Sequence, residues 1–265
     1  MAYVWQRPGT AAGALITVLD DVIALNANWS IYDAAAGANA KVYRCAGDIT
    51  FYVYIGDNQT NYSNIVVWAS WDSGTHTGSG STTTNGTLCK YYEGYVIYVN
   101  DNRFVYVNIG LTSASSFGHY CGLINRADTS KNLVLVHSGS TSTYYKTYNA
   151  LAGYGSSSYV RCQLMEDVDG NSNVAAYPIA YSGSETTRFL FDLDGRPHVY
   201  ETPMWYGSSN PRNFIGWLDG VMCLRTTAVP SPFWANDIIT VDGVDWAIYS
   251  QGTSSQNSFL VREQG

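Results

Sequence analysis

The sequence predicts a mainly β protein made of one or two antiparallel β-sandwich modules with a short N-terminal α-helix. From Trp29 onward, short alternating or apolar runs follow one another, and clusters of Gly, Asn, Asp and Ser separate them. The chain also contains 22 Tyr and 8 Trp, which suit pleated sheets. Its 265 residues are enough for one large β domain or two smaller ones.

One amphipathic helix is expected between Thr10 and Asn28. Apolar residues recur there three and four positions apart, with polar residues on the opposite side. Thr10 can serve as the N-cap, and Asn26 and Asn28 can end the helix because asparagine tolerates the left-handed cap conformation. The apolar positions are Leu15, Val18, Leu19, Val22 and Ile23.

Strands are expected in short runs that are bounded on both sides by turn residues. So many strands at short spacing favour stacked sheets. The expected strands are Lys41–Arg44, Thr50–Ile55, Ile65–Trp71, Tyr95–Asn100, Arg103–Ile109, Leu133–His137, Tyr159–Met165, Arg188–Leu193, Val221–Thr226, Ile238–Val241, Val244–Tyr249 and Ser258–Arg262.

Local chemistry predicts two turns and one loop. Asp242-Gly243 favours a type I′ hairpin between the strands on either side, because both residues accept positive φ angles. A second tight reversal is expected at Asn100–Asn102. The polar, low-complexity segment from Trp71 to Thr87 is expected to be a long exposed loop, either a mobile tip or a hook that orders on a neighbouring subunit.

The expected domain organisation has three parts. Residues 1–29 form an N-terminal arm and helix, residues 30–152 a first β-sandwich module, and residues 153–265 a second β module. The stretch Gly153–Ser158 marks the boundary between the modules. This stretch could equally be a wide hairpin loop, in which case the two modules are one domain.

Charge and hydropathy exclude several partners. Charged residues make up 13 % of the chain, about half of the ~25 % usual in soluble domains, and the net charge is −7. No Lys/Arg stripe exists to neutralise phosphates, so nucleic acid is not an expected partner. No apolar run reaches the ~18 residues of a membrane span. The apolar stretch Ala11–Leu19 superficially resembles a signal peptide, but Asp20 and Asp21 interrupt it, so no export signal is expected.

The cysteines and the acidic turns predict neither a metal nor another cofactor. The five cysteines lie far apart, with no C-x-x-C pair, which indicates buried reduced thiols in a protein made in the cytosol. Asp167–Asn173 and Asp192–Gly195 are explained by Asp-Gly turns, because an EF-hand loop needs Gly and Glu where Ser172 and Pro178 stand. The cysteines are Cys45, Cys89, Cys121, Cys162 and Cys223.

No catalytic residue is predicted. The histidines accompany no G-x-S-x-G elbow, no H-E-x-x-H and no phosphate-binding Gly-rich loop. A glycoside hydrolase needs two paired carboxyl groups, and none of the few glutamates lies in a signature for that role. The sequence therefore favours a protein that is not an enzyme. The histidines are His76, His119, His137 and His198.

Several aromatic residues near polar amides are candidates for a binding surface. They could stack on sugar faces, as in lectin-like sites, or contact a neighbouring protein. The alternative is ordinary packing in the core or between subunits, and the sequence leaves both possibilities open. The candidates are Trp68, Trp71, Tyr91, Tyr92, Trp205 and Tyr206.

The two ends of the chain carry a distinctive order of elements. The short start Tyr3–Pro8 precedes a helix that ends near Asn26–Trp29, and aromatic-rich strands follow. The chain closes on the Asp-Gly hairpin with Trp246–Tyr249 and on Phe259–Glu263. This order resembles that of virion structural proteins of tailed bacteriophages, in which a leading helix precedes β-sandwich modules that stack in the tail, the baseplate or the head–tail region.

The resemblance implies a non-enzymatic structural component of a tailed-phage virion, located in the tail or its junctions. Its partners would be other virion proteins and further copies of the same chain, and it would be made in the host cytoplasm. Assembly would also cover the exposed edges that isolated β domains must manage. The alternative is a glycan-binding module that recognises a host-surface polysaccharide, and a polysaccharide depolymerase is less favoured.

Overall fold

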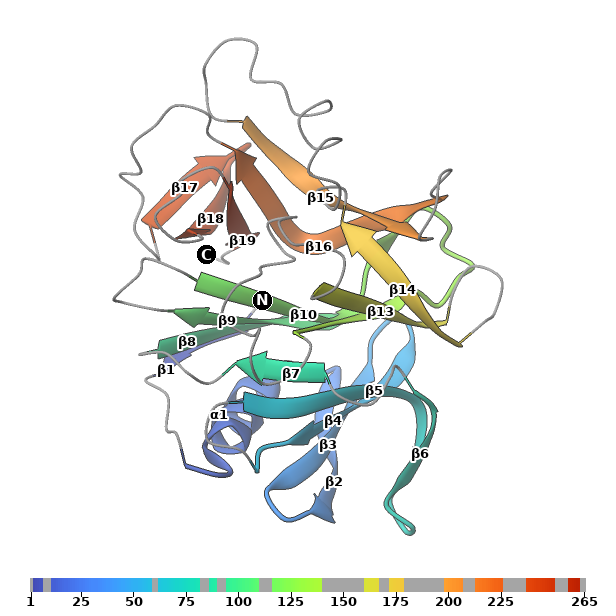
Figure 1. Cartoon of the computed structure of the whole chain (residues 1–265). Helices are drawn as coiled ribbons and strands as arrows, with labels where there is room; N and C mark the ends of the chain where they lie inside the picture. Colours follow the sequence, from blue (N-terminus) through green and yellow to red (C-terminus); the bar gives the residue numbers. More distant parts are fainter. Residues whose placement is uncertain are drawn as a thin grey trace.

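A computed structural model describes most of the chain as one α-helix and a network of 19 antiparallel strands (Figure 1). The predicted mainly β fold with a short N-terminal helix is therefore confirmed. Three sheets stack on one another, and they are called here the lower, middle and upper sheet. The described residues are 2–6, 11–58, 62–81, 86–89, 94–109, 116–139, 160–166, 172–178, 198–206, 213–225, 237–250 and 257–262.

The lower sheet is a run of hairpins at the bottom of Figure 1. Its first four strands pair in the order of the chain. The fourth, β5, is long enough to pair with β6 along its C-terminal half and with β7 along its N-terminal half. The strands are β2 (Trp29–Gly37), β3 (Ala40–Ala46), β4 (Thr50–Gly56), β5 (Tyr62–Asp72), β6 (Thr77–Ser81) and β7 (Gly86–Cys89).

The middle sheet has the strand order β1-β8-β9-β10-β12. The next two strands, β13 and β14, continue the ladder from β12 toward the upper sheet. The strands are β1 (Ala2–Gln6), β8 (Gly94–Val99), β9 (Arg103–Ile109), β10 (Ser116–Leu123), β12 (Val134–Gly139), β13 (Val160–Glu166) and β14 (Ser172–Pro178).

The upper sheet follows from β14 in the order β15-β16-β19-β18-β17. A short strand, β11, joins it to the middle sheet by pairing with β16 directly after β10 has ended. The strands are β11 (Asn125–Arg126), β15 (His198–Tyr206), β16 (Asn213–Arg225), β17 (Asp237–Val241), β18 (Val244–Ser250) and β19 (Asn257–Arg262).

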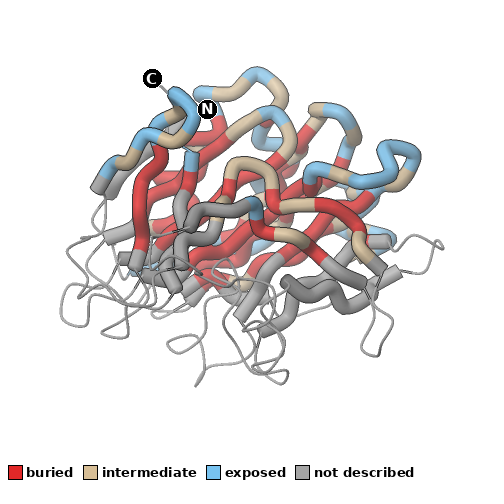
Figure 2. The backbone as a smooth tube through the Cα atoms, turned by 90° about the horizontal axis from the view of Figure 1, so that it is seen from above, coloured by how far each residue is buried: buried red, intermediate tan, exposed pale blue. Residues whose placement is uncertain are grey.

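Two hydrophobic cores lie on opposite faces of the middle sheet. On β9, Phe104 and Tyr106 point into the core shared with the lower sheet, whereas Val105 and Val107 point into the core shared with the upper sheet. Antiparallel sheets commonly leave one face in water. This one buries both, and Figure 2 shows the buried residues running along neighbouring strands while exposed residues gather at the turns.

The helix α1 (Ala14–Ile23) closes one end of the lower core, where it contacts β1, β2 and β8. Its apolar residues are buried at the predicted spacing. The described residues include no helix long and apolar enough to cross a bilayer, α1 having only ten residues.

Both ends of α1 differ from the prediction. Thr10 is not the N-cap, because the helix begins at Ala14 and Gly13 occupies the cap position with a φ of 82°. The first turn is capped from outside the helix, since Oδ2 of Asp57 accepts a hydrogen bond from the Leu15 N–H at 2.8 Å. At the other end, neither of the two predicted asparagines adopts a left-handed conformation, and the helix stops at Ala24 with a φ of −62°.

The expected strands within the described residues are all present, and apart from Val221–Thr226 their ends are shifted by at most three residues. The expected strand Val221–Thr226 is the C-terminal part of the longer β16. The prediction of a long exposed loop from Trp71 to Thr87 is wrong, because Thr77–Ser81 pairs with β5 as β6. A strand can form from small polar residues when its partner supplies both the hydrogen bonds and the bulky side chains.

Both predicted turns are confirmed. Asp242 and Gly243 have φ angles of 52° and 77° and join β17 to β18 as a two-residue hairpin loop. Asn100–Asn102 reverses the chain between β8 and β9. Four predictions fall outside the described residues, in whole or in large part: the strand Arg188–Leu193, the module boundary Gly153–Ser158, and the acidic turns Asp167–Asn173 and Asp192–Gly195.

Candidate functional site

The outer face of the lower sheet carries a group of aromatic side chains that no core covers. Strand alternation produces part of it, because β4 sends Phe51, Val53 and Ile55 inward and the tyrosines between them outward. Register produces another part, because Tyr52 pairs directly with Trp68 on β5. This group is called the aromatic face, and it comprises Tyr32, Tyr52, Tyr54, Trp68 and Trp71.

The rings of the aromatic face contact one another. Trp71 stacks on Tyr54 with centroids 6.2 Å apart and contacts Trp68 edge to face at 5.8 Å. Tyr32 and Tyr52 form a second edge-to-face pair at 4.9 Å. Such pairs contribute about 0.5–1.5 kcal/mol each beyond the area that they bury. Tyr32 is exposed and the other four rings are half-buried, so the face keeps contact with solvent.

The hairpin formed by β5 and β6 completes the aromatic face from one side. The Trp68 ring lies flat against Gly78 on β6, where a Cβ atom would stand 2.4 Å from the ring. Only glycine leaves room for the indole at this position. The Gly/Ser composition of β6, which in the sequence suggested a loop, therefore serves close packing under a tryptophan.

Asp33 on β2 is the polar centre of the site. Its Oδ2 accepts hydrogen bonds from Trp71 Nε1 at 2.8 Å and from His76 Nδ1 at 2.7 Å. Its Oδ1 accepts the Ala35 N–H at 3.0 Å. The Asp33 side chain is only 3 % exposed, whereas that of His76 is 43 % exposed. One buried carboxylate thus joins the edge strand β2 to the tip of the β5–β6 hairpin.

The hydrogen bonds in this cluster favour the ionised form of the Asp33 carboxyl group. Burial alone would raise the pKa of Asp33, but hydrogen bonds from the His76 and Trp71 rings and from a backbone N–H outweigh it and hold that pKa below its usual value. An ionised carboxylate can only accept hydrogen bonds, so Nδ1 of His76 must carry a proton. In the neutral imidazole, Nε2 is then a hydrogen-bond acceptor.

The structure brings together only some of the residues that the sequence suggested as contacts. Trp68 and Trp71 are neighbours in the aromatic face. Trp205 and Tyr206 belong to β15, which pairs with β14 and β16 and is not part of the lower sheet. Tyr91 and Tyr92 lie outside the described residues.

Sequence reasoning considered His76 only as an isolated histidine in a loop. It missed four other members of this site: Tyr32, Asp33, Tyr52 and Tyr54. Asp33 and His76 are 43 residues apart, and no motif joins them. One local signal was available, because alternation along β4 places Tyr54 on the same face as Tyr52. The positive φ of His76, 55°, marks a tight turn that only the folded hairpin reveals.

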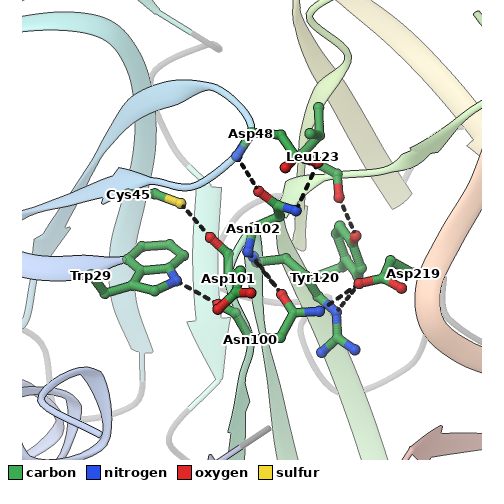
Figure 3. A network of polar contacts seen from close by, with 10 residues as sticks. Trp29, Cys45, Asp48, Asn100, Asp101, Asn102, Tyr120, Leu123 and Asp219 are labelled. Carbon is green, nitrogen blue, oxygen red and sulfur yellow. Dashed lines mark hydrogen bonds and ion pairs between the residues drawn. The ribbon is translucent and has the colours of Figure 1, made fainter. Parts of the chain in front are cut away.

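A second polar cluster surrounds the turn Asn100–Asn102 and ties the three sheets together (Figure 3). From the lower sheet, Trp29 Nε1 donates to the Asn100 carbonyl at 2.7 Å, and Cys45 Sγ donates to the Asp101 carbonyl at 3.3 Å. From the upper sheet, Asp219 accepts from Asn100 Nδ2 at 2.5 Å. These bonds use backbone groups and an asparagine, which indicates a structural role.

The same turn is held from two further directions. The Asp48 N–H donates to Asn102 Oδ1 at 2.7 Å, and the Leu123 N–H donates to the Asn102 carbonyl at 2.9 Å. The fully buried Arg103 follows the turn, with Nε 3.4 Å from Asp219 Oδ2. A pocket of about 300 Å³ adjoins this cluster, but its two carboxylates, Asp48 and Asp219, already have hydrogen-bond partners within the protein.

Three further reactive side chains, those of Cys45, Cys121 and His119, are buried. No group of three or more His, Cys, Asp or Glu there is arranged to hold a metal. Cys45 and Cys121 are buried free thiols, as expected; burial raises the pKa of Cys45 to about 12 and that of Cys121 well above its usual value. His119 is buried beside Tyr106, with ring centroids 5.8 Å apart.

No protein-family model matches the chain, and no curated protein matches its sequence.

Proposed function

We propose that this chain is a non-enzymatic structural component of a tailed-phage virion, which assembles in the tail with copies of itself and with neighbouring virion proteins. The resemblance in element order supports this proposal, as does the low proportion of charged residues. The observation that carries it concerns two edge strands, β2 of the lower sheet and β17 of the upper sheet. Each pairs with a neighbour on one side only among the described residues.

Each of these two strands leaves one edge unpaired within the part of the chain that the structure describes. Among the described residues, β2 pairs only with β3 and β17 only with β18. Ile31 and Tyr32 on β2 are 44 % and 40 % exposed, and Ile238 on β17 is 45 % exposed. Edge strands of monomeric proteins usually carry lysine or proline that blocks pairing with another chain. Neither strand contains either residue. The protection that remains is weaker: β2 has register shifts in its pairing with β3 and an inward-turned Asp33, and β17 begins with Asp237.

An open apolar edge is stable in solution when another strand covers it. A second copy of the chain offers the same edge, so β2 can pair with β2 across a two-fold axis, and the same holds for β17. Two such edges on one chain would support extended assembly rather than a single dimer. This is the behaviour required of a part repeated within a tail.

The first test measures assembly and location directly. We expect light scattering and native mass spectrometry of the full chain to show oligomers, and mass spectrometry of purified virions to detect the chain as a stoichiometric part. A strict monomer that is absent from the particle would overturn the proposal.

The second test places a charge on each edge. Ile31→Lys and Ile238→Lys should each weaken self-association about tenfold or more, because lysine on an edge strand opposes pairing. Leu25→Lys is the matched control, since Leu25 is 60 % exposed but follows the helix instead of lying on a strand. Equal weakening by all three variants would point to general charge repulsion and contradict edge pairing.

A further inference from the structure

The side chains of the aromatic face offer contacts that pairing between edge strands would not use. It combines ring surface open to solvent with hydrogen-bonding groups held in fixed positions. Trp71 is fixed at its indole N–H by Asp33 and on one face by Tyr54. Trp68 is fixed by Gly78 beneath its ring. Rings that are immobile before a ligand arrives lose little conformational entropy when it binds.

His76 supplies a polar group beside these rings. Trp71 and His76 share one oxygen of Asp33, at 2.8 and 2.7 Å, so the imidazole and the indole are held next to each other. With Nδ1 donating to the carboxylate, Nε2 is the nitrogen left to accept a hydrogen bond from a ligand. The His76 side chain is 43 % exposed, so that nitrogen belongs to a side chain that a ligand can approach.

The margins of the hairpin carry hydroxyl groups and the exposed carboxylate of Asp72, but no Lys or Arg. The hydroxyls of Ser70 and Ser79 lie 2.7 Å apart on the exposed surface of β5 and β6, and those of Thr75 and Thr77 lie 2.7 Å apart at the tip. The segment from Ala69 to Ser81 contains no Lys or Arg. Such a margin fits a ligand that is rich in hydroxyl groups and carries no negative charge.

A sugar ring has this combination of surfaces. One face of a hexose presents C–H groups that pack on aromatic rings, and its rim presents hydroxyls that donate and accept hydrogen bonds. A protein partner is less suitable, because stable protein interfaces bury ~800 Å² on each side. Four of the five rings here are half-buried and expose only part of their surface.

We propose that the aromatic face binds a neutral oligosaccharide, with one sugar ring packed on Trp68 and Trp71 and a sugar hydroxyl donating to Nε2 of His76. This inference goes beyond assembly in a virion and does not depend on it. A chain that failed to oligomerise would leave the glycan measurements below unchanged.

The test uses the full chain and neutral oligosaccharides of glucose, galactose and mannose, screened on an array and then titrated by calorimetry. We expect saturable binding of at least one of them. Trp68→Ala should weaken that binding about tenfold or more, through loss of the packing surface. His76→Ala, at a side chain that is 43 % exposed, should weaken it severalfold without loss of the folded state, as judged by circular dichroism.

The matched control is Trp217→Ala, because Trp217 is also half-buried against an aromatic ring, Phe214, but lies on β16 in the upper sheet. It should leave glycan affinity unchanged. Any of three results would overturn the proposal: an array blank for neutral glycans, binding that survives both Trp68→Ala and His76→Ala, or binding lost equally in Trp217→Ala. Capture of a peptide or protein by this face in place of a glycan would overturn it as well.

Discussion

The buried side chain of Asp57 caps the helix α1 in place of a capping residue next to the helix in the sequence. It is fully buried at the end of β4, and it accepts hydrogen bonds from the Leu15 N–H at 2.8 Å and from Ser63 Oγ at 2.6 Å. The helix has no side-chain cap of its own, so this carboxylate also supplies the negative charge that a helix N-terminus favours. The contact therefore joins α1 to the lower sheet.

Asp57→Ala should lower the free energy of unfolding by about 2–4 kcal/mol, because it leaves a helix N–H and a hydroxyl buried without their acceptor. Chemical denaturation monitored by circular dichroism measures this change. Asn58→Ala is the control, since the neighbouring Asn58 is exposed and should change stability by less than about 0.5 kcal/mol. Similar effects of the two variants would contradict the capping role.

Asp33 should make stability depend on pH in the acid range. Its folded-state pKa lies below the usual 3.8, so its contribution is present above pH 3.8 and is lost as the pH falls through the lower folded value. Asp33→Asn should therefore reduce the melting temperature at pH 6, and the difference from the native chain should shrink as the pH approaches 3. Melting curves at several pH values test this; a difference that stays constant down to pH 3 would count against an ionised Asp33.

The thiols of Cys45 and Cys121 should be unreactive in the folded protein. Both are buried, and burial raises the pKa of each, so neither provides an accessible thiolate near neutral pH. After brief treatment with iodoacetamide, peptide mass spectrometry should find both unmodified, and both should be alkylated once the chain is unfolded. Labelling of either thiol in the native state would contradict the packing of the lower core.

Two glycines in turns are required for different reasons. At one, neighbouring atoms leave no room for a side chain; at the other, only the backbone conformation disfavours one. Gly47, between β3 and β4, approaches the Asn100–Asn102 turn so closely that a Cβ atom would stand 2.2 Å from the Asp101 carbonyl oxygen. Gly243, in the β17–β18 hairpin, has a φ of 77° and open space around it. The first position excludes a side chain by contact, and the second disfavours one only through its backbone conformation.

Gly47→Ala should destabilise the protein by about 3 kcal/mol or more, because backbone atoms must shift to admit the methyl group. Gly243→Ala should cost only about 1–2 kcal/mol, the usual penalty for a left-handed residue with a side chain. Denaturant unfolding of both variants compares the two effects. A larger loss for Gly243→Ala would mean that the close approach at Gly47 is not a real constraint.

Strands and turns whose own residues show alternation or turn chemistry could be predicted from the sequence. Elements that form only because another segment of the chain contacts them could not. Alternation in Thr50–Ile55 and the Asp-Gly pair at 242–243 gave a strand and a hairpin in the right places. The strand β6 has the sequence TGSGS, which resembles a loop, and it became a strand only because β5 supplies its hydrogen bonds. The N-cap was mispredicted because the group that caps α1 comes from Asp57.

The candidate site was predictable to the same limited degree. Trp68 and Trp71 were identified from residue type alone, and the structure places them together. The polar centre was not identifiable, because Asp33 reaches Trp71 and His76 across 38 and 43 residues. Contacts at such separations follow from how the sheet curls, which no local spacing encodes.

At the scale of the whole molecule, the middle sheet should be the last part to open. β9 pairs on both sides, with β8 and β10, and its residues Arg103–Val107 are buried on both faces. β6 pairs only with β5 among the described residues and is largely exposed. Hydrogen exchange should therefore be about a thousandfold or more slower in β9 than in β6. Comparable rates, measured by mass spectrometry of peptides, would contradict this order.

The turn Asn100–Asn102 has a mechanical consequence. It is bonded to Trp29 in the lower sheet, to Leu123 in the middle sheet and to Asp219 in the upper sheet. A force that pulls the outer layers apart therefore loads the hydrogen bonds of this turn together with the strand pairs β7–β12, β11–β16 and β14–β15. Because both outer sheets are bonded to the same short turn, unfolding of the turn would weaken the attachment of both sheets together.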